Sequence, residues 1–177
     1  VGSEMCIRDR LWETIEDDFS GHEILNLGFG GATIDYCSFY FDRLIKPNRI
    51  KSFVFYAGDN DIGQGKSATQ VFDSFLILYN KFRQSFPSTK FTFVSIKPSI
   101  ERAKFINRIQ KANKLIEEFL DKEPNTFYLN IHDKMLNGDS LAKRELFTED
   151  ELHMSEKGYE LWTKIFHENS EEIFGIK

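Results

Sequence analysis

Apolar residues recur along the chain in two alternating patterns. One pattern places them three or four positions apart, which is typical of helices that bury one face. The other is a short unbroken run of β-branched and aromatic residues, which is typical of buried strands. The expected helices cover residues 11–19, 36–44, 71–86, 105–120 and 156–174, and the expected strands cover residues 23–27, 50–57, 90–96 and 126–131.

The alternation of strands and helices predicts the fold class. Parallel strands joined by crossover helices form a sheet with helices on both faces, so we expect an α/β protein. A length of 177 residues suits one domain, and no repeat, linker or low-complexity tract divides the chain. Sites in such sheets form beyond the carboxyl ends of the strands. Candidate chemistry is therefore sought there and just before the last helix, which Ser155 is placed to cap.

Composition and charge exclude several classes of protein. Lys and Arg are scattered among Asp and Glu and the net charge is −5, so no nucleic-acid partner is expected. No apolar run reaches the roughly 18 residues of a membrane span. Cys6 and Cys37 form neither a disulfide framework nor a zinc pattern, which favours free thiols. No signal peptide is visible, so the cytoplasm is the default location unless a leader preceded the true N-terminus, and the oligomeric state is not predicted.

Two glycine-rich segments suggest nucleotide binding, but their spacing rejects it. In "LNLGFGGAT", Gly28 and Gly30 fit a dinucleotide fingerprint, yet its third glycine falls on Thr33 and no acidic ribose partner follows. In "YAGDNDIGQGKSAT", a P-loop needs a glycine five positions before Gly65, where the chain has Asn60. The first segment remains a tight turn between strand and helix. The second remains an amide between two carboxylates at a strand's end, or an Asx turn.

A third segment, "FTEDELHMSEKGY", brings a histidine close to a carboxylate. His153 follows Asp150 by three residues and lies just before the last expected helix, a setting for a catalytic dyad. The alternative is a capping box formed by Thr148 and Glu151, with Asp150 as a first-turn charge. His132 follows a strand and is a weaker candidate base.

The three segments together match the requirements of acyl transfer. A general base needs an imidazole held in one tautomer by an acceptor, which Asp150 would provide for His153. The developing oxyanion needs hydrogen-bond donors, which a backbone N–H in the Gly30–Gly31 turn and the side-chain NH₂ of Asn60 would provide.

On these blocks ("NLGFGGAT", "AGDND" and "DELH") the sequence resembles the SGNH, or GDSL-type, hydrolases, and especially the branch related to platelet-activating-factor acetylhydrolase subunits. The resemblance spans residues 26–153 and implies a flavodoxin-like three-layer α/β/α fold. It also implies a serine esterase or acylhydrolase that acts on a small ester and uses no metal or organic cofactor. By position, Gly31 and Asn60 would be the oxyanion donors, His153 the base and Asp150 its orienting partner.

This chain departs from the family pattern at the nucleophilic serine. In this branch a strand and a motif like G-S-S-S-I-R precede a helix such as "LWETIEDDF", and counting back from Trp12 places the serine at Ile7. Ser3 is the one serine in the segment and the candidate nucleophile. Its glycine is adjacent rather than two residues earlier, it lies four residues too far from the helix, and only Val1 and Gly2 precede it.

One hypothesis explains these departures. Residues 1–10, "VGSEMCIRDR", resemble a translated sequencing-adapter fragment, so the esterase domain would cover residues 11–177 and lack its first strand and its serine. The chain as printed would then be nearly inactive. Two rivals remain: a metal hydrolase with Asp59, Asp61, Asp150 and His153 as ligands, and a carbohydrate- or partner-binding module on the same fold.

Overall fold

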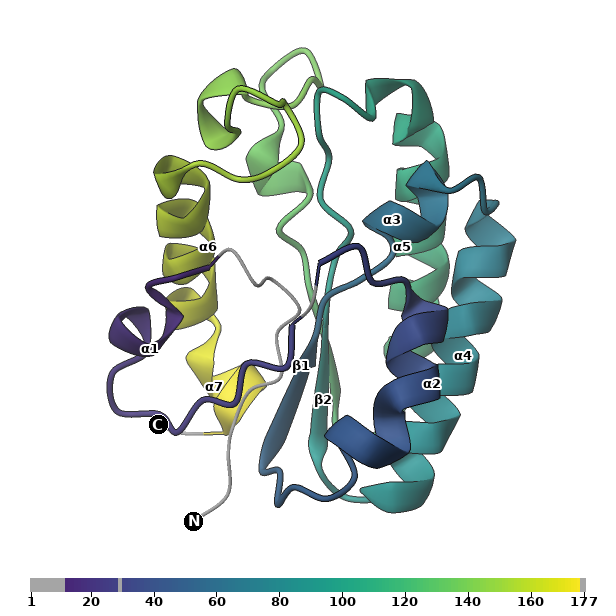
Figure 1. Ribbon diagram of the computed structural model, residues 1–177. Coiled ribbons are helices and arrows are strands. Elements are labelled where there is room, and N and C mark those ends of the chain that lie inside the picture. Colours follow the sequence, from purple (N-terminus) through teal and green to yellow (C-terminus); the bar gives the residue numbers. More distant parts are fainter. Residues whose placement is uncertain (1–11, 29, 176–177) are drawn as a thin grey trace.

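Three parallel strands form the centre of the molecule (Figure 1). The computed structural model describes residues 12–28 and 30–175. The strands are β1 (Ser52–Phe55), β2 (Lys90–Val94) and β3 (Thr126–Leu129), hydrogen-bonded in the order β1-β2-β3. Phe53 pairs with Phe91 across the first ladder, and Phe93 with Tyr128 across the second.

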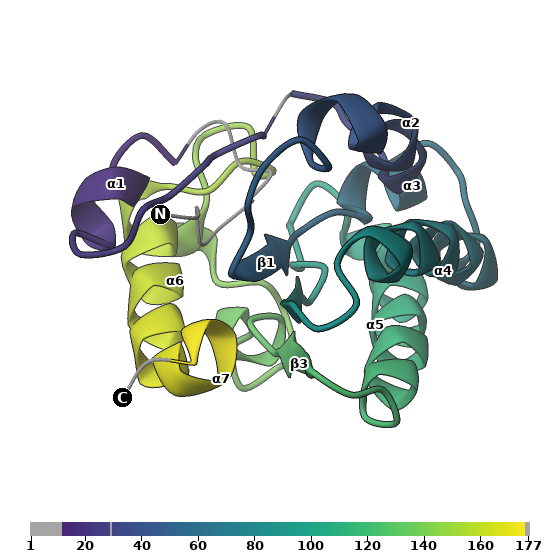
Figure 2. The same ribbon diagram turned by 90° about the horizontal axis from the view of Figure 1, so that it is seen from below.

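Helices cover both faces of this sheet, so the predicted α/β/α fold is confirmed (Figure 2). One layer holds α2 (Ile34–Leu44), α4 (Ala68–Ser85) and α5 (Ile106–Leu120). The other holds α1 (Ile15–Asp18), α6 (Glu156–Glu168) and α7 (Ser170–Phe174). A short helix, α3 (Asp59–Gly63), follows β1, and 3₁₀ turns cover Ala103–Phe105, Asp133–Met135 and Arg144–Leu146.

The strands divide the core into two apolar clusters by simple alternation. Because successive side chains of a strand point to opposite faces, Phe53 and Phe55 join the cluster under α2, α4 and α5. Val54 and Tyr56 join the cluster under α1 and α6, together with Trp12. Trp12 is 1% exposed, so the chain is packed into the core from the first residue described.

The structure corrects several predicted elements. Residues 23–27 form no strand of the described sheet, and of the described part of the first expected helix, residues 12–19, only Ile15–Asp18 are helical. The helix expected over 156–174 divides at Asn169, whose side chain donates to the carbonyl oxygen of Ile165 (2.7 Å) and so ends α6. The cap on α6 is confirmed, since the Ser155 hydroxyl accepts from Gly158 N–H (3.3 Å).

In the part of the chain described here, no helix is long and apolar enough to cross a membrane.

Candidate active site

The turn after β1 requires a glycine, and it places the first residues of the candidate site. Gly58 has φ 118°, in the left-handed region, and a Cβ on it would lie 2.6 Å from Cδ1 of Ile96. The chain therefore reverses tightly here, and α3 begins at once with Asp59 and Asn60. The segment for which an Asx turn was the alternative interpretation thus begins a short helix.

Asn60 lies against the glycine-rich loop that precedes α2. Its Nδ2 atom is 3.3 Å from the carbonyl oxygen of Ala32, and its Oδ1 accepts a hydrogen bond from Nη2 of Arg102 (3.0 Å). Gly31 in that loop has φ 70°, and among the described residues its N–H has no hydrogen-bond acceptor. The two predicted oxyanion donors thus come from neighbouring segments, although they are 29 residues apart in sequence.

Asp150 and His153 form the predicted pair. Nδ1 of His153 lies 2.5 Å from Oδ2 of Asp150. Oδ1 of Asp150 accepts from the backbone N–H groups of His153 (2.9 Å) and Leu152 (3.0 Å), and from the hydroxyl of Thr148 (2.8 Å). The hydrogen bond from His153, followed by the backbone ones, holds the pKa of Asp150 well below its usual range.

An ionised Asp150 fixes the role of the imidazole. A carboxylate at Nδ1 favours the tautomer that carries its proton there, which leaves Nε2 to accept a proton. Among the residues described, no group hydrogen-bonds Nε2 of His153. No helix begins at Thr148, whose hydroxyl serves Asp150 instead, so the capping-box alternative is wrong.

The loop that carries His153 is held in a strained conformation by the segment after β2. Glu151 has φ 60°, which is unfavourable for a residue other than glycine. Its carbonyl oxygen accepts from the N–H groups of Ile100 and Glu101, both at 3.2 Å. The carbonyl oxygen of Leu152 accepts from Nζ of Lys97 at 3.0 Å.

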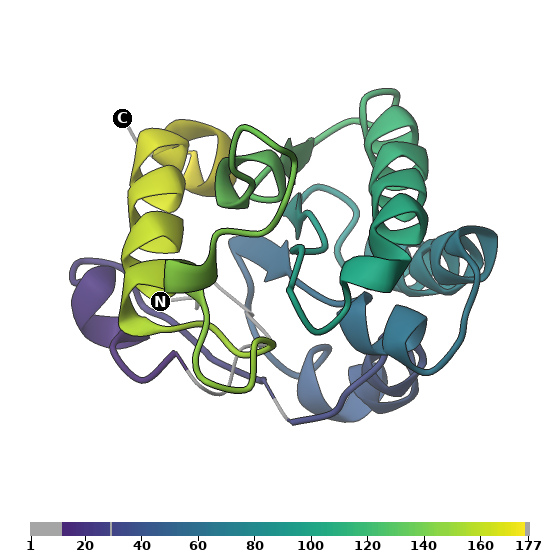
Figure 3. The same ribbon diagram turned by 90° about the horizontal axis from the view of Figure 1, so that it is seen from above.

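A buried ion cluster connects the two halves of the site. Oδ2 of Asp59 lies 3.6 Å from Nζ of Lys97 and 3.4 Å from Nη1 of Arg102, and all three side chains are at most 13% exposed. Since Arg102 also binds Asn60 and Lys97 also binds Leu152, an unbroken set of contacts runs from the Gly31 loop to His153. Figure 3 looks down on this edge of the sheet, where the loop before α2, α3 and the loop before α6 surround the strand ends.

Arg102 and Lys97 were missed by the sequence analysis. Both lie in the segment that follows β2, and basic residues beyond the carboxyl end of a buried strand were the available signal. Their partners lie 42 and 55 residues away, so the sequence alone did not pair them. Ser3 and position 7, where the nucleophile was sought, lie outside the described residues.

The other candidate ligands and bases have different partners. Asp61 is fully buried and accepts from the N–H of Ile34 (3.0 Å) and from Nζ of Lys66 (3.0 Å). His132 is also buried and its Nδ1 contacts Asp133 (3.0 Å). Within residues 12–28 and 30–175, no three metal-ligating side chains are grouped to hold an ion. The metal-hydrolase alternative therefore has no ligand set in that part of the chain.

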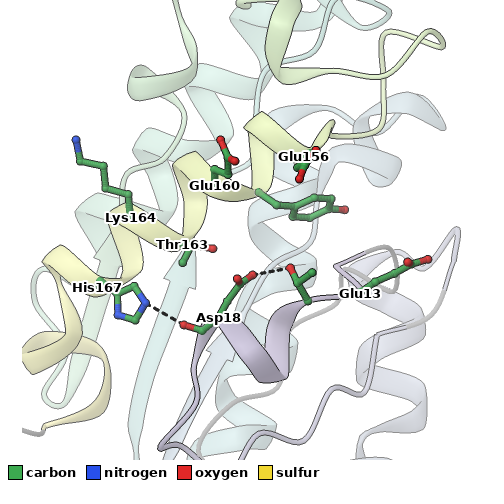
Figure 4. Close-up of a pocket in the computed structure, with 9 residues that line it drawn as sticks. Glu13, Asp18, Glu156, Glu160, Thr163, Lys164 and His167 are labelled. Carbon is green, nitrogen blue, oxygen red and sulfur yellow. Dashed lines mark hydrogen bonds between the residues drawn. The ribbon is translucent and has the colours of Figure 1, made fainter.

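A separate pocket of about 650 Å³ lies between α1 and α6 (Figure 4). Its walls carry four carboxylates, and none of Gly31, Asn60, Asp150 or His153 lines it. His167 Nε2 contacts the carbonyl oxygen of Asp18 (2.9 Å), and the Thr14 hydroxyl donates to the Asp18 carboxylate (2.7 Å). The contact of His167 attaches α1 to α6, and the Thr14 hydrogen bond lies within the α1 segment, so these pocket residues have a structural role.

The class of protein is defined by the family to which the sequence matches, and it is that of ester-bond hydrolases. The family model of GDSL-like lipases and acylhydrolases matches residues 5–161, so the chain belongs to the GDSL-like lipase/acylhydrolase family. The match includes Gly31, Asn60, Asp150 and His153 and begins after Ser3. None of the curated proteins matches the chain in sequence.

Solved structures of low sequence identity share the fold. A protein from Streptococcus pneumonia, provisionally described as a platelet activating factor, superposes with a TM-score of 0.84 at 19% identity, over 95% of this chain and 84% of its own. A GDSL-like lipase from Bacteroides thetaiotaomicron gives 0.77 at 18% identity, over 96% and 87%. A family 3 carbohydrate esterase from Talaromyces cellulolyticus gives 0.73 at 14% identity, over 95% and 96%.

Proposed function

We propose that this protein hydrolyses small acyl or acetyl esters through an acyl-enzyme formed on a serine. The observation that carries the proposal is the Asp150–His153 pair, tied through Lys97, Asp59 and Arg102 to Asn60. It is supported by membership of a family of lipases and acylhydrolases. The fold is shared with a lipase and a carbohydrate esterase, which favours lipid or sugar esters as the classes to screen first.

Each residue has a defined step in this mechanism. The serine oxygen attacks the ester carbonyl while Nε2 of His153 takes the hydroxyl proton, and Asp150 stabilises the imidazolium that forms. The N–H of Gly31 and Nδ2 of Asn60 bind the carbonyl oxygen as it becomes negative. The intermediate collapses, the alcohol leaves with the proton from His153, and water then hydrolyses the acyl-enzyme by the same route.

We further propose that residues 1–10 stand in place of the native nucleophile block and that the esterase domain is residues 11–177. In support, Trp12 is already fully packed against Trp162 and Phe166, whereas the spacing around Ser3 does not fit the family pattern. Sequencing the genomic locus tests this directly. A locus that encodes these ten residues would reject the hypothesis.

The decisive experiment compares the printed chain with one in which the upstream sequence of the locus is joined to Leu11. We expect the restored chain to hydrolyse p-nitrophenyl acetate, to be labelled by a serine-reactive phosphonate, and to lose both properties in His153→Ala. The printed chain should be nearly inactive and indifferent to Ser3→Ala. Turnover by the printed chain that Ser3→Ala abolishes would instead establish Ser3 as the nucleophile.

A negative result with the restored chain also has a clear interpretation. If it folds, binds an acetylated oligosaccharide and neither reacts with the phosphonate nor releases acetate, it is a binding module on a hydrolase fold. A panel of acetyl, butyryl and octanoyl p-nitrophenyl esters and an acetylated xylo-oligosaccharide then separates the substrate classes.

A further inference from the structure

The carboxamide of Asn60 is bound on its two sides by groups of opposite polarity. Oδ1 receives the guanidinium of Arg102 at 3.0 Å, and Nδ2 faces the carbonyl oxygen of Ala32 at 3.3 Å. A guanidinium only donates hydrogen bonds and a carbonyl oxygen only accepts them. Both contacts therefore select the same one of the two orientations that a carboxamide can adopt by rotation. In that orientation Nδ2 points toward the Gly31 loop.

Arg102 is itself held in place from several directions. Its side chain is 11% exposed, with Nη1 3.4 Å from Asp59 and Nε 3.4 Å from Glu101. A Cβ on Gly63 would lie 3.0 Å from the guanidinium, so the last residue of α3 packs directly against it. A planar guanidinium fixed in this way is a rigid donor, which a flexible ammonium group would not match.

We infer that Arg102 is a positioning residue, which orients Asn60 so that its N–H, and not its oxygen, faces the developing oxyanion. This inference rests on the proposed function. One N–H of Nδ2 is directed at Ala32, and the second is available to the ester oxygen. Without Arg102, the carboxamide would also populate the rotated state, in which Oδ1 faces the oxyanion and repels it.

Four variants of the full chain test the inference. Arg102→Met removes the donor with little change in volume, and Arg102→Lys keeps a charge and a donor. Gly63→Ala leaves every charge in place but forces the guanidinium to shift, and it serves if Arg102→Met does not fold. The matched control is Arg83→Met, because Arg83 is also anchored, through hydrogen bonds to Thr89, Pro124 and Asn125, but lies away from the site.

The first readout needs no catalysis. NMR relaxation of the side-chain amide nitrogen of Asn60, assigned by its loss in Asn60→Ala, reports whether the group is fixed. We expect an order parameter of about 0.85 in the parent chain and below about 0.6 in Arg102→Met. Arg102→Lys should be intermediate, Gly63→Ala should be lower than the parent, and Arg83→Met should match the parent. An Asn60 amide equally rigid in parent and Arg102→Met would overturn the inference.

The second readout is kinetic and uses p-nitrophenyl acetate with the active form of the chain. Arg102→Met should lower kcat by about tenfold or more, at most by the 10²–10³ expected for Asn60→Ala, with KM little changed. In an Asn60→Ala background it should cause no further loss, because its effect acts through Asn60. If the kcat losses of Arg102→Met and Asn60→Ala multiplied in the double variant, the two residues would act independently and the inference would be contradicted.

The two readouts keep the inference separate from the proposed function. If no form of the chain hydrolyses the ester, the proposed function fails. The relaxation result then still decides whether Arg102 fixes the Asn60 amide.

Discussion

The carboxylate of Asp150 receives hydrogen bonds from the backbone N–H and the ring Nδ1 of His153, from the N–H of Leu152 and from the hydroxyl of Thr148. Such convergence on a half-exposed side chain stabilises the charged form. The pKa of Asp150 is therefore lowered, first by the His153 side chain. The carboxylate stays ionised throughout the pH range in which an imidazole can act as a base.

A lowered pKa of Asp150 predicts how stability responds to acid. Because the folded-state pKa lies below the unfolded value of about 3.9, the contribution of Asp150 is present above that pH and is lost as pH falls below it. Asp150→Asn should therefore have a lower urea midpoint than the parent at pH 6, and the gap should narrow at pH 3. A gap that stays constant between these two pH values would show that the charge of Asp150 is not involved.

Asn60→Ala tests the oxyanion assignment. Loss of one oxyanion donor should lower kcat for p-nitrophenyl acetate on the order of 10²–10³ in the active form of the chain. Because Asn60 also contacts Ala32, the urea midpoint of the variant is measured as well, so that a loss of stability is separated from a loss of catalysis. An unchanged kcat would remove Asn60 from the proposed mechanism.

How much of the site could be predicted depended on sequence separation. Asp150 and His153 are three residues apart, so their contact followed from local spacing. Asn60 and Gly31 were assigned through a family motif. Arg102 has no motif, and its contact with Asn60 exists only because β1 and β2 end side by side.

At the level of elements, Asp61 joins the start of α2 to α3. Its buried carboxylate accepts from the N–H of Ile34, the first residue of α2, and from Lys66. Burial raises the pKa of Asp61, so its charged form is tolerated only because these partners are present. The Gly31 loop leads directly into α2, and this contact therefore also holds the Gly31 loop against α3.

Asp61 variants should separate the loss of the acceptor from the loss of the charge. Asp61→Ala leaves the Ile34 N–H unpaired and removes a partner of Lys66, which should lower the free energy of unfolding by about 3 kcal/mol. Asp61→Asn keeps an acceptor for Ile34 and should lose about 1 kcal/mol or less. Urea unfolding measures both, with Asp73→Asn on the exposed side of α4 as a control that should leave the midpoint unchanged. Equal losses for the two Asp61 variants would contradict this account.

The elements themselves were largely predictable because their signals are local. The capping box of α4, formed by Ser67 and Gln70, and the cap of α6 by Ser155 act within one helical turn. The strand expected over residues 23–27 is reduced to a single β-bridge residue, Ile24, because an apolar run becomes a full strand only where a neighbour pairs along its length. Helix α3 was missed because it is a single short turn that depends on Gly58.

At the scale of the whole molecule, the apolar cluster under α1 and α6 includes the start of the described chain. Trp12 contacts Phe19, Trp162 and Phe166 with edge-to-face ring geometry. The packing of this buried tryptophan against two aromatic rings of α6 therefore fixes the position of α1 on α6.

The proposed domain boundary predicts that the stability of the protein tolerates removal of residues 1–10 but not a substitution at Trp12. Removal of residues 1–10 should leave the melting temperature unchanged, because those residues are proposed to be foreign to the fold. Trp12→Ala should lower the free energy of unfolding by about 4 kcal/mol. Thermal melts of both, with Glu13→Ala on the exposed side as control, measure the difference. A large loss on removal of residues 1–10 would show that they belong to the domain.

The contacts that assemble the site join distant parts of the chain: 28 residues separate Asn60 from Ala32, 42 separate Arg102 from Asn60, and 55 separate Lys97 from Leu152. Parallel sheets and such long loops have a high contact order, which slows folding because loop-closure entropy is lost before the contacts form. Helices α4 and α5 can form early from local signals, whereas the ion cluster around Asp59 requires β1 and β2 to be paired in register. We therefore expect the geometry of the site to form late in folding, and until then the phenylalanine-rich strands β1 and β2 lack their covering helices, which favours aggregation.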